Sequence, residues 1–275
     1  MRRHRYCVAH TLTGRYISII RRTVMSKIKS ISEFLDTVLS VHKGWGKAQG
    51  EIWFRGIVRE DMQLLPGVKW RDIEDKEDTI VSDFMVHGHS MLEIEPKNGW
   101  QWYSLMQHYG LPTRLLDWSK SPLTAVYFAL DGNGDTDRVI WCMDPYELNK
   151  ETANSNHLFV PGEFAHEEDG VNLTNYLPFS LRDDKSAKVP VAPLAIEPPY
   201  TNRRILAQKG CFTIHGSKNE PIDTYFRNGI GIKKLVLDKN FVESMRLELK
   251  VFGVDIDTIY QDLNSLSKRI ISDYS

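Results

Sequence analysis

The sequence predicts an α+β protein in which helices flank a core sheet of mixed or antiparallel strands. Helical periodicity dominates both ends of the chain, and short runs of aromatic and β-branched residues lie between them. These runs do not alternate regularly with helices, as they would in a doubly wound parallel sheet. With 275 residues, 41% of them hydrophobic, the chain can bury a sizeable core.

The N-terminal elements follow from capping and periodicity signals. Ser30 and Glu33 have the spacing of a capping box, and apolar residues at a helical repeat carry the first helix to about Lys43. Residues 51–58 are an aromatic and β-branched run that is typical of a strand. The next elements are expected to be a turn at 64–67, helices at 76–91 and 100–109, a loop at 113–119 and a helix at 121–130.

Two helix boundaries in this region have signals of their own. Gly110 stands where a glycine would end the helix at 100–109, and Pro112 follows it. Ser121 is a suitable N-cap for the next helix, with Pro122 as its first residue. The polar segment between these two helices is therefore expected to be a loop.

The C-terminal half is less regular. Residues 144–200 are rich in proline and polar residues with weak periodicity, which predicts a long, partly ordered insertion with short strands. The other elements are expected to be a turn at 131–135, a strand at 138–143, a segment at 205–215 that ends as a strand, a strand at 234–237, and helices at 241–252 and 260–271.

The chain is expected to hold one domain, at residues 25–275, behind a basic extension. Residues 1–24 carry six arginines and no acid. One interpretation is a targeting or nucleic-acid-binding arm. The other, which we favour, is a mobile or spurious upstream segment with translation starting at Met25, because a domain start follows Met25 directly.

Composition excludes several classes of protein. A net charge of −1 is incompatible with a uniformly basic nucleic-acid-binding surface, although a local basic patch is allowed. Three cysteines without a C-x-x-C pair predict a reducing, cytoplasmic environment, with Cys142 and Cys211 buried as small apolar residues. Since no run of eighteen apolar residues exists, no membrane span is expected.

The first candidate stretch for a functional site contains Arg55. This arginine lies within an apolar strand and keeps its charge, so it requires an anion or hydrogen-bond acceptors. The functional interpretation is a phosphate or carboxylate clamp, and the alternative is a structural ion pair with an acid such as Asp117. Gly56 is expected to allow close approach of another backbone or of a ligand.

The second stretch, residues 107–118, places many different hydrogen-bonding groups between two helices. His108 is a candidate acid or base, Arg114 a candidate anion ligand, and Asp117 a group that orients either one. The alternative is a loop held by an Arg114–Asp117 ion pair, with His108 a satisfied core histidine. The remaining predicted ligand contacts from this stretch are Gln107, Tyr109 and Thr113.

The third stretch, residues 203–212, combines cations with a polar amide. An alternating pattern would place Arg204, Leu206 and Gln208 on one face of an extended segment, with Gly210 marking a close approach. We predict that Arg204 and Gln208 bind ligand. The alternative is an edge strand whose exposed cations discourage aggregation.

Other motifs are weak. His87 and His89 have no partners at metal-ligand spacing, so we interpret them as surface residues. Glu163 and His166 match half of a di-iron pattern by chance. The sequence contains no P-loop, dinucleotide-binding glycine fingerprint or nucleophile elbow, so neither a metal nor a firm cofactor is predicted.

The three stretches resemble the FRG domain, a family named for a Phe-Arg-Gly motif. Here that motif is Phe54-Arg55-Gly56. The strongest similarity is the run from Gln107 to Trp118, continued by the helix at 121–130, and a late similarity includes Arg204, Gln208 and Phe212. The resemblance extends over about residues 30–270.

A weaker resemblance connects the chain with ADP-ribosyltransferases of the arginine-serine-glutamate type. Trp53 to Gly56 is similar to their aromatic-Arg-Gly strand, whose arginine supports NAD binding, and 115–129 is loosely similar to a later strand and helix. The resemblance implies an ADP-ribosyltransferase-like fold with NAD as substrate. The chain departs from the family in the late strand, where Gln208 stands near the usual glutamate motif, so either Asp117 substitutes or this catalysis is absent.

The leading hypothesis is therefore a nucleotide-binding domain, an ADP-ribosyltransferase-like effector of bacterial or phage conflict acting on a protein or nucleic-acid target. In that hypothesis Arg55 and Arg114 grip phosphates, His108 and Asp117 position the ribose or acceptor, and Gln208 lines the cleft. The second hypothesis is a non-catalytic module that binds nucleic acid or another anionic partner. The third is that these polar residues form only an internal network.

Overall fold

The computed structural model describes residues 26–46, 51–92, 94–132, 134–162, 170–198 and 203–275. The basic extension at residues 1–24, the proposed start at Met25 and the Glu163–His166 pair lie outside the described residues.

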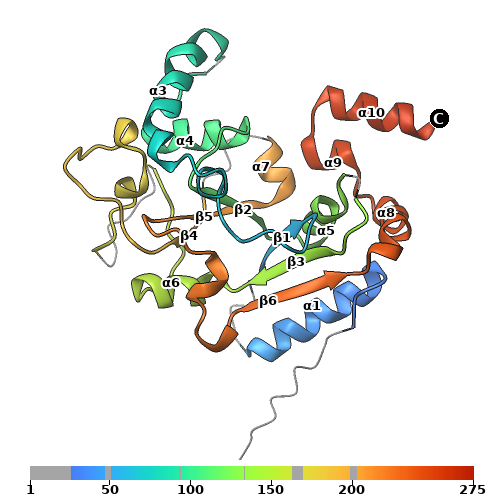
Figure 1. Cartoon of the computed structure of the whole chain (residues 1–275). Helices are drawn as coiled ribbons and strands as arrows, with labels where there is room; N and C mark the ends of the chain where they lie inside the picture. The colour runs from blue at the N-terminus through green and yellow to red at the C-terminus, as the bar shows by residue number, and fades with distance from the viewer. Residues whose placement is uncertain (1–25, 47–50, 93, 133, 163–169, 199–202) are drawn as a thin grey trace, which may run out of the picture.

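One antiparallel sheet forms the centre of the fold (Figure 1). Its six strands lie in the order β4-β5-β2-β1-β3-β6, and every neighbouring pair is antiparallel. The expected α+β class is thus confirmed. The strands are β1 (Trp53–Ile57), β2 (Leu115–Ser119), β3 (Arg138–Met143), β4 (Leu194–Ile196), β5 (Gly210–Ile214) and β6 (Ile232–Leu237).

Helices lie on both faces of the sheet (Figure 1). They are α1 (Ile31–Trp45), α2 (Gly67–Trp70), α3 (Glu77–Gly88), α4 (Gly99–His108), α5 (Pro122–Leu130), α6 (Pro145–Ala153), α7 (Arg203–Gln208), α8 (Val242–Val251), α9 (Ile256–Tyr260) and α10 (Leu263–Asp273). Short 3-10 segments occur at Glu74–Lys76, His89–Met91, Leu173–Tyr176, Phe179–Leu181, Ile222–Tyr225, Arg227–Gly229 and Lys239–Phe241.

One face of the sheet carries a hydrophobic cluster that crosses all six strands. Side chains two apart on a strand share a face, so the register places Trp53 and Trp118 with Cys211 on this face. Helix α6 and the segments near Leu64 and Phe226 complete the cluster. This continuous layer holds the two halves of the sheet together.

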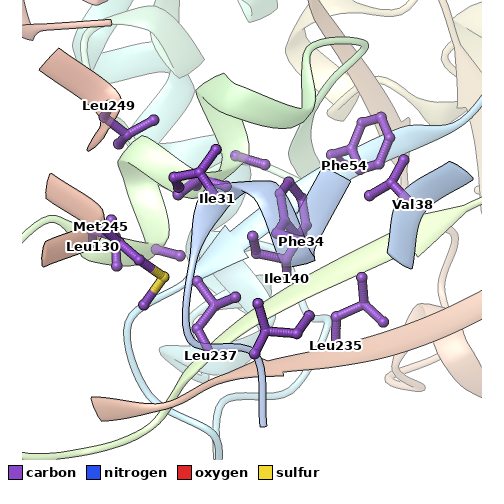
Figure 2. Close-up of a cluster of buried hydrophobic side chains, with 14 of the residues drawn as sticks. Ile31, Phe34, Val38, Phe54, Leu130, Ile140, Leu235, Leu237, Met245 and Leu249 are labelled. Atoms are coloured by element: carbon purple, nitrogen blue, oxygen red, sulfur yellow. The ribbon is translucent and has the colours of Figure 1, made fainter. Parts of the chain in front are cut away.

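The opposite face carries two separate clusters. The first lies over β1, β3 and β6, where side chains of α1, α5 and α8 converge on Phe54 and Ile140 (Figure 2). The second lies over β2, β4 and β5, where α3 and α4 pack against Leu115 and Phe212. The boundary between these clusters is the junction of β1 with β2.

The expected helix boundaries are present with one change. Ser30 Oγ accepts a hydrogen bond from Glu33 N at 3.1 Å, but the Glu33 carboxylate accepts from Lys29 N at 2.8 Å, so only half of the capping box forms. Ser121 Oγ caps α5. Gly110 follows α4 in the left-handed conformation, with φ of +81°, as the glycine signal predicted.

Two sequence predictions about local structure are wrong. Residues 113–119 are not a loop, because Leu115–Ser119 is strand β2 and pairs with β5 along its full length. Residues 203–208 are not extended, because they form helix α7. Neither an alternating face nor an edge strand exists there. Both segments are short, and tertiary contacts decide the structure of such segments more than local pattern does.

Two further segments differ from expectation. The irregular insertion at 144–200 contains a regular helix, α6, which Asp144 caps through hydrogen bonds at 3.0 Å from the main-chain nitrogens of Tyr146 and Glu147. The helix expected at 260–271 begins at Leu263 as α10, and a separate helix, α9, ends at Tyr260. They are separated at Gln261, whose φ of +51° ends α9.

Gly56 permits a close contact between β1 and α5. A Cβ atom at this position would lie 1.9 Å from the main-chain oxygen of Ala125 and 2.6 Å from the main-chain nitrogen of Ala129. The sequence predicted that another backbone or a ligand would approach Gly56 closely. The group that does so is the backbone of α5. Any side chain would push the helix away from the strand.

We expect Gly56→Ala to lower the free energy of unfolding by at least about 2 kcal/mol, because the added methyl overpacks a rigid contact. Urea denaturation measures the loss. The matched control is Gly44→Ala, since nothing lies within 4 Å of a Cβ at that helical position. An equal effect of the two substitutions would contradict the close-contact explanation.

Candidate functional site

A pocket of about 730 Å³ lies where β1 and β2 separate. Residues 54–57 of β1 and all of β2 line it, together with residues from the 62–71 and 107–113 segments, from α5 and from α7. This volume falls in the range of about 300–1,000 Å³ that is usual for small-molecule sites. The three stretches selected from the sequence meet here.

The pocket exists because β1 and β2 pair at one position. The ladder between them contains the single pair Phe54–Ser119, whereas β1 shares five pairs with β3 and β2 shares five with β5. The strands therefore form a fork, closed at Phe54–Ser119 and open toward Ile57 and Leu115. Separated strands leave main-chain polar groups that need other partners.

Arg55 supplies one of those partners. Its Nη1 donates a hydrogen bond to the main-chain oxygen of Asp117 at 2.6 Å and lies 3.9 Å from the Asp117 carboxylate. The Arg55 side chain is 25% exposed, and burial lowers its pKa, although it remains a cation at neutral pH. Arg55 thus bridges the fork and still faces the pocket.

The carboxylate of Asp117 is held in a defined position. Gln107 Nε2 donates to Asp117 Oδ2 at 2.8 Å, and the hydroxyl of Thr113 donates to Gln107 Oε1 at 2.5 Å. That hydroxyl also accepts a hydrogen bond from Leu115 N at 3.0 Å, so this series of hydrogen bonds is anchored at the start of β2. With 58% of its side chain exposed, Asp117 is oriented by protein and open to a ligand.

Helix α7 forms another wall of the pocket. Arg204 Nη1 donates to the main-chain oxygen of His108 at 3.4 Å, and its guanidinium lies 4.8 Å from the ring of Tyr260. Gln208 Nε2 donates to the main-chain oxygen of Ile259 at 3.3 Å. Helix α9 therefore positions α7, and the two helices lie next to each other in Figure 1.

His108 is half-buried at this wall. Burial lowers the pKa of its imidazole, and the positive charge of Arg204 lowers it further. The ring is consequently neutral at pH 7. A neutral imidazole can accept a proton or donate a hydrogen bond, as general base chemistry requires.

The charges around the pocket are unbalanced. Its lining contains three arginines (Arg55, Arg71 and Arg204) and one acid (Asp117), which gives +3 − 1 = +2 with His108 neutral. The whole chain has a net charge of −1. A local excess of positive charge in such a chain favours an anionic ligand.

Sequence analysis missed two pocket residues, Trp70 and Arg71. Both are exposed, and the Arg71 guanidinium lies 4.0 Å from the indole ring centre. They lie at the end of α2, between the turn expected at 64–67 and the helix expected at 76–91, where the sequence analysis assigned no element. The only sign of a site here is that an aromatic residue and a cation are adjacent in the sequence. Nothing in the sequence indicates that this pair lies near β1.

Eight predicted site residues line the pocket: Arg55, Gln107, His108, Tyr109, Thr113, Asp117, Arg204 and Gln208. Arg114 does not. It is buried, and its Nε lies 2.7 Å from a carboxylate oxygen of Glu77. The alternative in which an Arg114–Asp117 ion pair holds a loop is therefore wrong, because the Arg114 guanidinium pairs with Glu77 instead.

The expected close approach at Gly210 is also absent. A Cβ there would lie 3.4 Å from the nearest atom, on the Ile205 side chain, which is an ordinary contact. Cys142 and Cys211 are buried free thiols as predicted, and burial raises the pKa of both. His87 and His89 lie at the surface.

Comparison with known families identifies one part of the chain. The family model of the FRG domain matches residues 50–138. The chain contains an FRG domain. The matched range runs from β1 through α5, so it includes Arg55 and the whole run from Gln107 to Asp117, whereas α7 lies outside it. No curated protein and no solved structure matches the chain.

Two further findings describe the FRG-domain protein. Within the ranges that the structure describes, no helix is both long and apolar enough to span a bilayer. Over the same ranges, no three histidine, cysteine or acidic side chains gather as ligands for a metal ion.

In this FRG domain, Arg114 belongs to a buried network beside the pocket. Tyr103 OH donates to Glu77, and Arg114 N donates to the same hydroxyl at 2.7 Å. Arg114→Met should lower the free energy of unfolding by about 3–5 kcal/mol, because it leaves the buried Glu77 without its cation. Urea denaturation tests this expectation.

The double variant Arg114→Met/Glu77→Leu is the matched comparison, since it removes both charges together. We expect it to be more stable than Arg114→Met alone. A single variant as stable as the wild type would show that Arg114 is not a structural residue.

His215 should make the FRG-domain protein sensitive to acid. Burial, and then the charge of Lys69, lower the pKa of His215 from 6.5 to about 3. As pH falls from 6.5 toward 3, the unfolded chain binds a proton that the native state does not, so stability is lost in that window. At pH 4 the loss is about 3 kcal/mol, from roughly 2.5 pH units at about 1.36 kcal/mol each.

The measurement is the free energy of unfolding at pH 7 and pH 4 for the wild type and His215→Gln. The variant should lose less stability than the wild type. His87→Gln, at an exposed position, controls for removal of a histidine. Parallel losses in wild type and His215→Gln would contradict the assignment.

Proposed function

We propose that the pocket between β1 and β2 binds a nucleotide or a related anionic ligand, with NAD as the leading candidate. The observation that carries this proposal is the +2 charge of a pocket of about 730 Å³ in a chain of net charge −1. Positive side chains that converge in a concave site are the usual means of binding phosphate groups.

Two of the three arginines keep their charge available for a ligand. Arg204 contacts the main-chain oxygen of His108 and the ring of Tyr260, and Arg71 contacts the main-chain oxygen of Gly67 and the ring of Trp70. These partners are all neutral. A diphosphate would therefore gain charge-assisted hydrogen bonds without first displacing a carboxylate.

Arg55 and Asp117 lie together inside the fork. In the proposed NAD site, Asp117 binds the ribose hydroxyls beside the nicotinamide and stabilises positive charge as the glycosidic bond breaks. His108, neutral at pH 7, acts as the base for an acceptor group. Gln208 contributes a hydrogen bond from α7. The resulting activity is ADP-ribosyltransferase-like, acting in bacterial or phage conflict.

The setting of Asp117 supports this assignment over a general anion site. Asp117 is held by Gln107 yet remains open to the pocket, which suits a carboxylate that must meet a forming cation. The late glutamate motif of ADP-ribosyltransferases is missing, and Asp117 is the acid in the pocket lining. The chemistry thus depends on Asp117.

Arg55→Ala should weaken NAD binding by at least about tenfold, since a hydrogen bond from a charged group is lost. Isothermal titration calorimetry measures the affinity, and Arg59→Ala is the control because Arg59 is exposed and outside the pocket lining. Thermal unfolding shows whether loss of the Arg55–Asp117 bridge also affects stability.

Asp117→Asn separates binding from catalysis. The substituted amide is nearly isosteric, so NAD should still bind, while nicotinamide release should fall by about a hundredfold or more without the carboxylate. Binding without turnover in the wild type would eliminate the transferase and retain the nucleotide site. If the wild type binds single-stranded nucleic acid in a salt-dependent way and no nucleotide, the protein is a binding module instead.

A further inference from the structure

The mouth of the pocket carries an exposed aromatic side chain with a cation stacked on it. Trp70 is 57% exposed, and Arg71 covers one face of its indole with a separation of 4.0 Å. Since more than half of this residue remains open to solvent, a planar group has room on the indole. Both residues line the same pocket as Arg55 and Asp117.

The segment that presents these two side chains is firmly anchored. Val68 is fully buried, and its main-chain nitrogen donates to the main-chain oxygen of Thr113 at 3.3 Å. The next side chain, Lys69, is buried, and its Nζ lies 2.8 Å from Oε1 and 2.9 Å from Oε2 of Glu74. Trp70 is therefore exposed on a rigid support.

This support also places the pair relative to the polar interior. Gly67 packs so closely on Pro112 that a Cβ would lie 3.2 Å from the Pro112 Cα. Thr113, which follows, holds Gln107 and through it Asp117. The open end of the β1–β2 fork is thus bordered by an aromatic platform, while the hydrogen-bonding groups lie inside.

We propose that Trp70 and Arg71 form a stacking platform for the nucleobase of the ligand. This inference rests on the proposed nucleotide site. It adds which part of the ligand binds at the mouth of the pocket. Indole rings stack on bases of any sequence because every base has a π face. Arg71 adds a cation beside the ring, where it can meet the phosphate that follows the sugar.

The test compares probes with and without a base. Calorimetric titrations use ADP-ribose, nicotinamide mononucleotide and ribose 5-phosphate against the wild type, Trp70→Ala and Trp70→Phe. We expect Trp70→Ala to weaken at least one base-bearing probe by about tenfold, and Trp70→Phe to retain most of the affinity. Ribose 5-phosphate should bind the wild type and Trp70→Ala within about twofold of each other, because it has no aromatic base to stack.

The chain offers a matched control pair outside the pocket lining. Phe179 is 51% exposed, and Lys185 Nζ lies 5.2 Å from its ring centre, so Phe179→Ala also removes an exposed aromatic residue from beneath a cation. It should leave all three affinities unchanged. Since Trp70 is exposed, Trp70→Ala should keep the wild-type thermal unfolding midpoint.

The remaining outcomes overturn the proposal in distinguishable ways. Equal weakening of all three probes in Trp70→Ala would show that Trp70 shapes the pocket rather than stacking on a base. Unchanged affinities of Trp70→Ala for all three probes would show that Trp70 does not contact the ligand, without contradicting the proposed nucleotide site. A wild type that binds none of the three probes would reject the nucleotide site, and the platform with it.

Discussion

The separation of β1 from β2 after the Phe54–Ser119 pair is the constraint on which the rest of the site depends. Sheet strands normally satisfy one another's main-chain groups. Here the side chain of Arg55 crosses the gap and bonds the main-chain oxygen of Asp117 instead. One hydrogen bond therefore closes part of the sheet and brings the arginine and the aspartate into the same space.

The two faces of the sheet respond differently to this separation. One face keeps a continuous hydrophobic layer, so the halves of the sheet cannot drift apart. The other face divides into two clusters, with α5 packed on one side and α4 on the other. A ligand site between two rigid cores needs little rearrangement to bind, because its walls are fixed by packing unrelated to the ligand.

Sequence alone located the site better than it described the local structure. The polar groups of 107–118 and the charge of Arg55 indicated a site, since such groups are costly within apolar sequence. The same polarity hid strand β2, whose Asp117 faces the gap rather than the core. The partner of Arg114 is Glu77, 37 positions earlier, and no local pattern encodes so distant a contact. The place of Trp70 in the pocket could not be predicted for the same reason, because no local pattern encodes its distant neighbours.

The limits of the family match have a consequence for dissecting the protein. Residues 50–138 contain β1 and β2 but, apart from the first residue of β3, neither of the strands that pair with them most extensively. A fragment cut at those limits would retain one ladder pair and lose the α7 wall, together with the α9 contacts that support it. The matched range is thus smaller than the set of strands and helices that shape the pocket.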